Sequence, residues 1–272
     1  MKKYFYSCLV AGVFVVACSS RSIEIDPNII HINDSNLEKA LIAQKIDSDS
    51  TINGQIKRSD AENVKVLSIP NLQIKSLSGI EGFKSLIYLD CSLNQITNLE
   101  LSQNSLLESL DCSSNILTKI DLSRNLNLAA LNCVNNQLKE LTILSKQLYA
   151  LNASNNLLVT VTIDSSTQLS LLYISNNQLK NLNLVNNLAL LELRCNSNEL
   201  ATIDLSKNVK LRYLDVSNNT LLTLDLCNNI EILKLICVSN NIAKITIPQK
   251  IQPIFANNNV LIDGKTSYST CD

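Results

Sequence analysis

Residues 86–104, LIYLDCSLNQITNLELSQN, decide the fold of this 272-residue chain. A shift of 21 residues brings the pattern back, with apolar residues at Leu107 and Leu110, a cysteine at Cys112 and an asparagine at Asn115. Ten such units begin at Val64, Leu86, Leu107, Leu128, Leu148, Leu169, Leu190, Leu211, Ile232 and Ile251. Because the first and fourth positions are apolar in all ten units, we predict a repeat protein whose neighbouring coils share one core over residues 64–263.

The repeat L-x-x-L-x-C-x-x-N-x-L-x-x-L-x-L-S-x-N-x-x resembles the leucine-rich repeat family, specifically its short 21-residue bacterial class. The resemblance implies a mainly β repeat solenoid, a stack of coils with a parallel concave sheet. The second apolar pair of each unit, such as Leu99 with Leu101, alternates with period two and predicts short second strands on the convex side. Residues 77–83, LSGIEGF, resemble the first repeat of internalin-like proteins, where a cap joins the coils.

An asparagine occupies the ninth position of nine units. These residues are Asn94, Asn115, Asn136, Asn156, Asn177, Asn198, Asn219, Asn240 and Asn259. A turning backbone inside a solenoid leaves buried amides and carbonyls that are costly unless they are bonded, and an asparagine offers both a donor and an acceptor. We therefore interpret this column as a structural ladder.

Five of the nine cysteines occupy the sixth position of their units. They are Cys91, Cys112, Cys133, Cys195 and Cys237, and the other units have Ile, Val or Ala there. This favours buried free thiols, because a free cysteine behaves as a small apolar side chain. Disulfides between neighbouring strands are the alternative, and a bridge from Cys271 that pins the C-terminal tail, residues 264–272, over the last coil is another.

The N-terminus resembles that of a bacterial lipoprotein. Lys2 and Lys3 precede a short apolar stretch, 4–16, which ends in a lipoprotein-type box at Ala17 and Cys18. The resemblance implies that residues 1–17 are a signal peptide and that Cys18 is lipidated; a plain signal peptide is the alternative.

Residues 18–33 lack periodicity and are expected to form a flexible tether. If Cys18 is lipidated, the chain should be anchored in the cell envelope by this N-terminal lipid alone. Ser19 favours the outer membrane or the cell surface. The net charge of −1 gives no field for binding nucleic acid.

Residues 34–63 are predicted to form a small helical cap, with Ser35 and Glu38 spaced as a capping box. The following segment, 49–60, resembles a degenerate EF-hand loop. Its implied calcium ligands are Asp49, Asn53, the carbonyl of Gln55, and Asp60. Thr51 and Asp60 depart from the usual ligands, so either weak calcium binding or a vestigial turn is expected.

Positions three, five and seven of each unit should point out of the concave sheet, because positions four and six point inward. The candidate partner-binding residues there are Tyr88, Asp90, Asp111, Tyr173, Glu192, Arg194, Tyr213, Asp215 and Phe255. Four of the seven aromatic residues after residue 17 fall on this surface. Such rings favour binding hot spots, although tyrosine also suits an exposed strand.

An enzyme is the poorest fit to this sequence. The single histidine, His31, falls in the expected tether, and no phosphate loop or dinucleotide motif is present. The leading hypothesis is a non-enzymatic envelope lipoprotein whose concave face binds a protein partner, for adhesion or contact with a host or another cell surface. The alternatives are a periplasm-facing envelope scaffold and a glycan-binding surface protein. No cofactor is expected, apart from the weak calcium.

Overall fold

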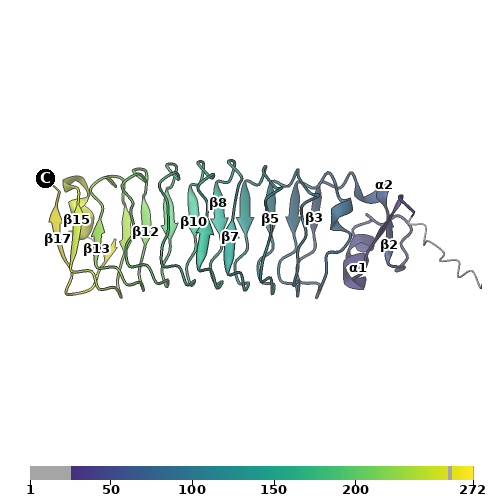
Figure 1. Cartoon of the computed structure of the whole chain (residues 1–272), viewed down its shortest axis with the longest axis horizontal. Helices are drawn as coiled ribbons and strands as arrows, with labels where there is room; N and C mark the ends of the chain where they lie inside the picture. Colours follow the sequence, from purple (N-terminus) through teal and green to yellow (C-terminus); the bar gives the residue numbers. More distant parts are fainter. Residues whose placement is uncertain (1–25, 257–258, 272) are drawn as a thin grey trace, which may run out of the picture.

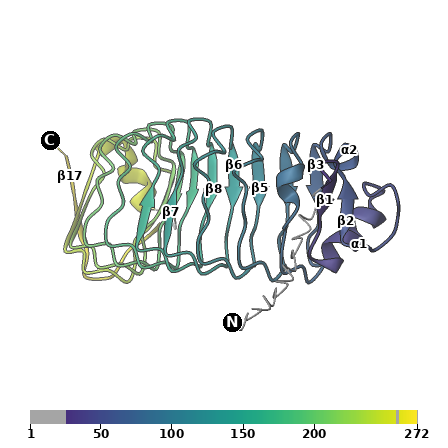
Figure 2. The same cartoon turned by 45° about the vertical axis from the view of Figure 1, so that its right-hand side comes forward.

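The computed structural model describes residues 26–256 and 259–271 as an elongated stack of coils with a small cap at its N-terminal end (Figure 1). Figure 2 shows the same stack turned, with the cap and the C-terminal coils at opposite ends. No helix in the described residues is both long and apolar enough to span a membrane. The predicted repeat solenoid is confirmed.

One parallel sheet of ten strands runs the length of the stack. Its strands are β3 (Val66–Ser68), β4 (Tyr88–Asp90), β5 (Ser109–Asp111), β6 (Ala130–Asn132), β8 (Ala150–Asn152), β10 (Leu171–Tyr173), β11 (Glu192–Arg194), β12 (Tyr213–Asp215), β14 (Lys234–Ile236) and β16 (Val260–Leu261). We call it the long sheet. Its outer face is the surface predicted to be concave. The central leucines stand in register, so that Leu89 pairs with Leu110 and Leu110 with Leu131.

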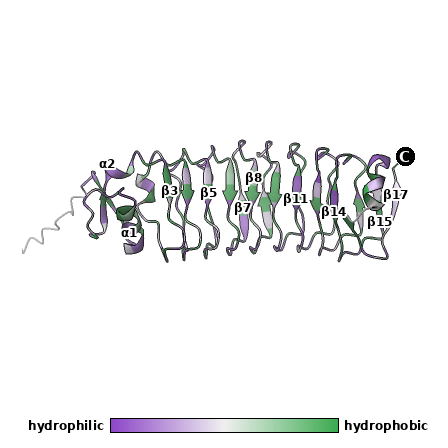
Figure 3. Cartoon of the chain, turned by 180° about the vertical axis from the view of Figure 1, so that it is seen from behind, coloured by the Kyte–Doolittle hydropathy of each residue, from purple (hydrophilic) through white to green (hydrophobic). Residues whose placement is uncertain are grey.

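The core is a set of apolar columns that run from coil to coil, and Figure 3 shows hydrophobic residues recurring in this way along the stack. Cys91, Cys112 and Cys133 follow one another in one column and are fully buried. Burial raises the pKa of Cys133 to about 12, so this thiol stays protonated at neutral pH. The five cysteines at position six are free, as predicted.

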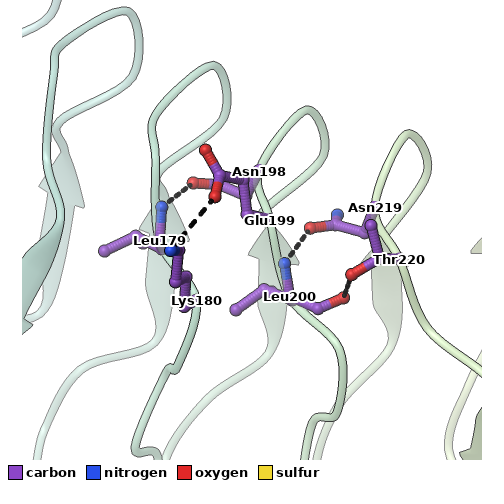
Figure 4. A network of polar contacts seen from close by, with 7 residues as sticks. All are labelled: Leu179, Lys180, Asn198, Glu199, Leu200, Asn219 and Thr220. Atoms are coloured by element: carbon purple, nitrogen blue, oxygen red, sulfur yellow. Dashed lines mark hydrogen bonds and ion pairs between the residues drawn. The ribbon is translucent and has the colours of Figure 1, made fainter.

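The asparagine ladder is confirmed over eight coils, from Asn94 to Asn240. In the part drawn in Figure 4, the side-chain oxygen of Asn198 accepts the backbone N–H of Leu179 at 3.0 Å. Its amide nitrogen donates to the carbonyls of Ile174 and Cys195 at 3.0 and 3.1 Å. Each asparagine thus bonds backbone groups of its own coil and of the preceding coil, which removes the cost of burying them.

The side predicted to be convex carries two short sheets. One pairs β7 (Glu140–Thr142) with β9 (Thr160–Thr162). The other joins β13 (Thr223–Asp225), β15 (Lys244–Ile247) and β17 (Ser267–Thr270). In the described coils between these two sheets, the second strands do not form a continuous sheet. The prediction of a second strand in each coil therefore holds for only part of the stack.

The prediction for the last coil is wrong. Val260, and not Ile254, pairs with Leu235, so this coil is longer than 21 residues. The additional residues form a 3-10 helix, η2 (Gln249–Ala256), which contains Pro253 and Phe255. A proline lacks the N–H that a central strand needs, which explains why the unit that begins at Ile251 does not keep the repeat.

Three further predictions are wrong because the last coil is longer than expected. Phe255 is not on a strand of the long sheet, and the exposed Asn259 lies outside the asparagine ladder. The expected tail, 264–272, contains β17, which pairs with β15, so the solenoid continues beyond residue 263. The bridge predicted as an alternative exists, because Cys271 is bonded to Cys227.

The cap begins earlier than predicted. β1 (Ile29–His31) pairs antiparallel with β2 (Gln55–Lys57), so residues 29–31 of the expected tether, His31 included, are a strand. The remaining cap elements are α1 (Ser35–Ala43) and α2 (Arg58–Ala61). A 3-10 helix, η1 (Ile80–Gly82), joins the cap to the coils after Gly79, whose φ is 104° and whose Cβ position is occupied by His31 and Ile32.

The capping box is also wrong. Asp34 is the N-cap of α1, and its carboxylate accepts the N–H groups of Asn36 and Leu37. Glu38 is instead buried, and one of its oxygens accepts three consecutive N–H groups where the cap loop enters β2. Spacing alone could not show this, because the loop reaches Glu38 only through the tertiary structure.

Candidate functional site on the outer face of the long sheet

Eight of the nine predicted partner-binding residues lie on the outer face of the long sheet. They are Tyr88, Asp90, Asp111, Tyr173, Glu192, Arg194, Tyr213 and Asp215. Each occupies the first or third residue of its strand, on either side of a buried leucine. Period-two alternation in parallel strands places all of them on one surface.

Arg194 is the centre of an aromatic and cationic stack. Its guanidinium lies 5.1 Å from the ring centroid of Tyr173 and 4.7 Å from that of Tyr213. The same group forms an ion pair with Glu192 at 2.6 Å. The ammonium of Lys234 also lies near the Tyr213 ring, 5.3 Å from its centroid. These contacts join side chains from the strands β10, β11, β12 and β14.

The sequence places Lys234 on the outward face, but Lys234 was not among the candidate partner-binding residues. The signal was available, because Lys234 occupies the third position of the unit after that of Tyr213, and the two residues pair in register. What the sequence did not show is that the long lysine side chain turns toward the neighbouring ring.

A shallow depression of about 240 Å³ lies at the N-terminal side of this stack. Its floor contains small side chains of β5, β6 and β8, including Ser109, Ala130 and Ala150. Tyr88 and Tyr173 line it as well, from β4 and β10. A strand spacing of about 4.8 Å separates these two tyrosines by roughly 19 Å along the stack.

The outward aspartates have a structural role that spacing did not reveal. One oxygen of Asp90 accepts the N–H and the hydroxyl of Ser92, at 3.0 and 2.7 Å. Asp111 binds Ser113 in the same way. The prediction that position seven faces outward is therefore wrong for Ser92 and Ser113, which are buried beneath these carboxylates where the strand ends.

The two ends of the outer face differ in charge. From β3 to β8 the outward residues include two carboxylates, Asp90 and Asp111, and no lysine or arginine. Burial raises the pKa of Tyr88 above its usual value, and these two carboxylates raise it further. From β11 to β14, by contrast, the charges of Glu192 and Asp215 are accompanied by two cations.

The residues proposed as calcium ligands lie in or beside one loop of the cap. Asp49 accepts the N–H of Thr51 at 2.8 Å and the side-chain amide of Asn53 at 3.0 Å. Gln55 lies in β2 and donates its N–H to Asn53 at 2.9 Å. Asp60 lies in α2 and accepts the N–H of Ser48 at 3.1 Å.

A further acidic residue, Asp47, was not among those ligands. It is buried, with 2% of its surface exposed, and one of its carboxylate oxygens has no hydrogen-bond partner. Burial raises its pKa, and repulsion from Asp49, Glu38 and Asp60 raises it further. These carboxylates are near enough to repel Asp47, but no three of them lie close enough together to hold a metal ion as the loop stands.

One group of histidine, cysteine or acidic residues in the described parts of the chain is compact enough to hold a metal ion. It consists of Asp225, Cys227 and Cys271. Because the two cysteines form a disulfide, their sulfurs are not available as thiolate ligands.

No model of a protein family matches the sequence, and no curated protein matches it. Solved structures do. The functional domain of InlJ from Listeria monocytogenes, which includes a cysteine ladder, has a TM-score of 0.64 and 24% identity, over 90% of this chain and 63% of that one. The leucine-rich-repeat protein LIC12759 of Leptospira interrogans has a TM-score of 0.63 and 23% identity, over 78% of this chain and 56% of that one.

The LRIM1/APL1C complex also matches, with a TM-score of 0.59 and 26% identity, over 79% of this chain and 41% of the matched chain. This chain therefore spans less than two thirds of the length of these proteins. The similarity shows that the chain has the leucine-rich-repeat fold of the internalin-like kind.

Proposed function

We propose that the chain is a non-enzymatic cell-envelope lipoprotein whose long sheet binds a protein partner with its outer face. The observation that carries the proposal is the stack of Tyr173, Arg194 and Tyr213 on that face. Tyrosine and arginine are the residue types that contribute most to protein interfaces. Because the stack is held in place by Glu192, little side-chain entropy is lost when a partner covers it.

The similar proteins support a binding role in general terms. One of the matched structures is a complex of two proteins, LRIM1 and APL1C. The long sheet presents an extended surface with a shallow depression of about 240 Å³, which suits a macromolecule better than an enclosed small substrate. Adhesion, or contact with a host or another cell surface, is the role that we propose.

A binding experiment with a matched control tests the proposal. The full chain, the Tyr173→Ala/Tyr213→Ala variant and the Thr160→Ala/Thr162→Ala variant of the convex strand β9 are immobilised and exposed to extracts of candidate partner cells. We expect the wild type and the convex variant to retain the same protein, and the tyrosine variant to lose it. Equal retention by all three would contradict the proposal.

Cys18 lies outside the described residues, and its lipidation is a further part of the proposal. We expect incorporation of a labelled fatty acid into the chain, and its loss in Cys18→Ser together with release from the membrane fraction. Protease treatment of intact cells then separates the orientations. Cleavage places the solenoid on the cell surface, as proposed, whereas protection would favour the alternative of a periplasm-facing scaffold.

A glycan ligand is the other alternative, and the depression between Tyr88 and Tyr173 is the observation that favours it. Aromatic rings and the amides of Asn132 and Asn152 are groups that bind sugars, and both amides line the depression. A glycan array probed with the wild type and with Tyr88→Ala/Tyr173→Ala distinguishes the classes. Protein binding without any glycan signal is the expected result.

We also propose that the acidic loop of the cap binds calcium weakly. The support is the unpartnered, buried oxygen of Asp47 and the repulsion among the neighbouring carboxylates. Millimolar calcium should raise the melting temperature of the wild type, and Asp49→Asn/Asp60→Asn should remove this shift. The control Asp204→Asn, on the convex side, should keep it. An unchanged wild type would identify the loop as a vestigial turn.

A further inference from the structure

The tripeptide Tyr-Leu-Asp occurs twice on the long sheet, in β4 as 88–90 and in β12 as 213–215. Both copies occupy the same three positions of their coils, so their side chains point in the same directions. Around the second copy two cations contact the Tyr213 ring: Arg194 at 4.7 Å and Lys234 at 5.3 Å. The second copy therefore shows that the tyrosine of this tripeptide contacts cations, while the carboxylate that pairs with Arg194 is Glu192.

The first copy lacks both cations. Ser68 pairs with Asp90 as Arg194 pairs with Asp215, and Ser109 pairs with Tyr88 as Lys234 pairs with Tyr213. The two positions that supply cations in β11 and β14 thus hold serines in β3 and β5. Among the described residues no ion pair involves Asp90 or Asp111.

The first copy instead has additional negative charge. Asp111, in the neighbouring strand β5, pairs in register with Asp90. The protein groups that donate to these two carboxylates are neutral: backbone N–H groups, hydroxyls such as that of Ser68 at 3.3 Å, and the amide of Asn132 at 2.8 Å. Neutral donors leave both negative charges uncompensated, so a cation is the ligand that this place favours.

We propose that Tyr88, Asp90 and Asp111 receive a lysine or arginine side chain of the protein partner. The cationic head lies on the Tyr88 ring and beside the carboxylates, in the way that Arg194 contacts Tyr213 and Glu192. Its apolar stem lies over the small side chains of the adjacent depression, such as Ser109 and Ala130. The inference rests on the proposed function, since it names the chemistry of the partner at one end of the same face.

The test uses the full chain with ¹³C-labelled tyrosine rings and two capped pentapeptides that differ only in a central arginine or glutamate. We expect the arginine peptide to shift the Tyr88 signal and to leave the Tyr213 signal unchanged, because Tyr213 already has its cations. Asp111→Asn should weaken the binding about fivefold, as expected for a partly exposed charge. The glutamate peptide should shift neither signal.

A second variant supplies the two missing cations beside Tyr88 from the chain itself. Ser68→Arg/Ser109→Lys reproduces the surroundings of Tyr213 around Tyr88 and should abolish the response to the arginine peptide. Because both serines are outward residues of short strands, the fold should persist, which the unchanged Tyr213 signal verifies.

Three results would overturn the inference: no Tyr88 shift with the arginine peptide, an equal shift with the glutamate peptide, or a shift with phosphocholine alone. The last would assign the place to a lipid headgroup. These outcomes are distinguishable from failure of the proposed function, because that test changes Tyr173 and Tyr213 and leaves Tyr88, Asp90 and Asp111 intact.

Discussion

The two ends of the solenoid are closed by different chemistry. At the N-terminal end the cap is held by carboxylates: Glu38 accepts the N–H groups of Asn53, Gly54 and Gln55 at 2.8, 2.7 and 3.2 Å. At the C-terminal end the last convex strand is held by a covalent bond between Cys227 and Cys271, which are 44 residues apart.

This difference shows that the open ends of a coil stack can be covered without a large second core. A buried carboxylate closes one end through directional hydrogen bonds, so that end depends on the acceptor oxygen of Glu38. A disulfide closes the other end by restricting the unfolded chain, so that end depends on redox conditions. The following predictions test the two end closures separately.

The largest expected effect is at Glu38. Glu38→Ala removes one acceptor from three N–H groups and should lower the free energy of unfolding by about 3–5 kcal/mol. Glu38→Gln keeps an acceptor oxygen and should cost clearly less. Urea unfolding measures both, and hydrogen exchange should show the loss at β2 while β15 and β17 stay protected. Equal losses at both ends would contradict the separation of the two closures.

The disulfide should come second. Cys227→Ser/Cys271→Ser should lower the free energy of unfolding by about 2–4 kcal/mol, and a reductant should have the same effect on the wild type. The five buried cysteines do not complicate this test, because they are free thiols that a reductant leaves unchanged. A reductant that still destabilised the double serine variant would show that the effect does not come from this bond.

Asp34 should make the N-terminal end sensitive to acid. Burial raises the pKa of Asp34, but the N–H groups of Lys75, Asn36, Leu37 and Ser76 lower it by more, so the pKa lies below its usual value. The stabilisation is therefore present above the unfolded-state pKa, about 3.9, and is lost as the pH falls through the lowered pKa.

Asp34→Asn tests this dependence. It should cost about 1 kcal/mol at neutral pH, and this cost should disappear as the pH falls through the lowered pKa of the wild-type carboxyl. Unfolding curves over this pH range provide the measurement. A constant difference between wild type and variant at every pH would exclude the carboxylate as the cause.

The smallest effect concerns the turn after each strand of the long sheet. Leu93, in the second coil, has a φ of 57° and is exposed, whereas the equivalent residue near the other end is Ser239, also with a φ of 57°. Leucine tolerates this left-handed conformation poorly. Leu93→Asn should raise the free energy of unfolding by about 0.5–1 kcal/mol, and Ser239→Asn by less. Melting curves of both variants provide the comparison.

Much of the candidate site could be predicted from the sequence, because it depends on local alternation. Tyr173, Arg194 and Tyr213 fall on one face of the long sheet as soon as the repeat register is known. The sequence did not predict that Arg194 lies between the two rings, since side-chain direction is decided by the neighbouring strands. Phe255 was misplaced because Pro253 and additional residues change the length of its coil.

The sequence by itself determined the coil stack, the leucine columns and the asparagine ladder, because each follows from a short repeat in which every coil meets the same neighbours. Only the tertiary structure decided that Glu38 binds the cap loop, that Cys227 pairs with Cys271, and that Tyr213 has cations where Tyr88 has none. The physical reason is that these contacts join residues without a fixed sequence spacing, and their energies depend on which groups packing brings within reach.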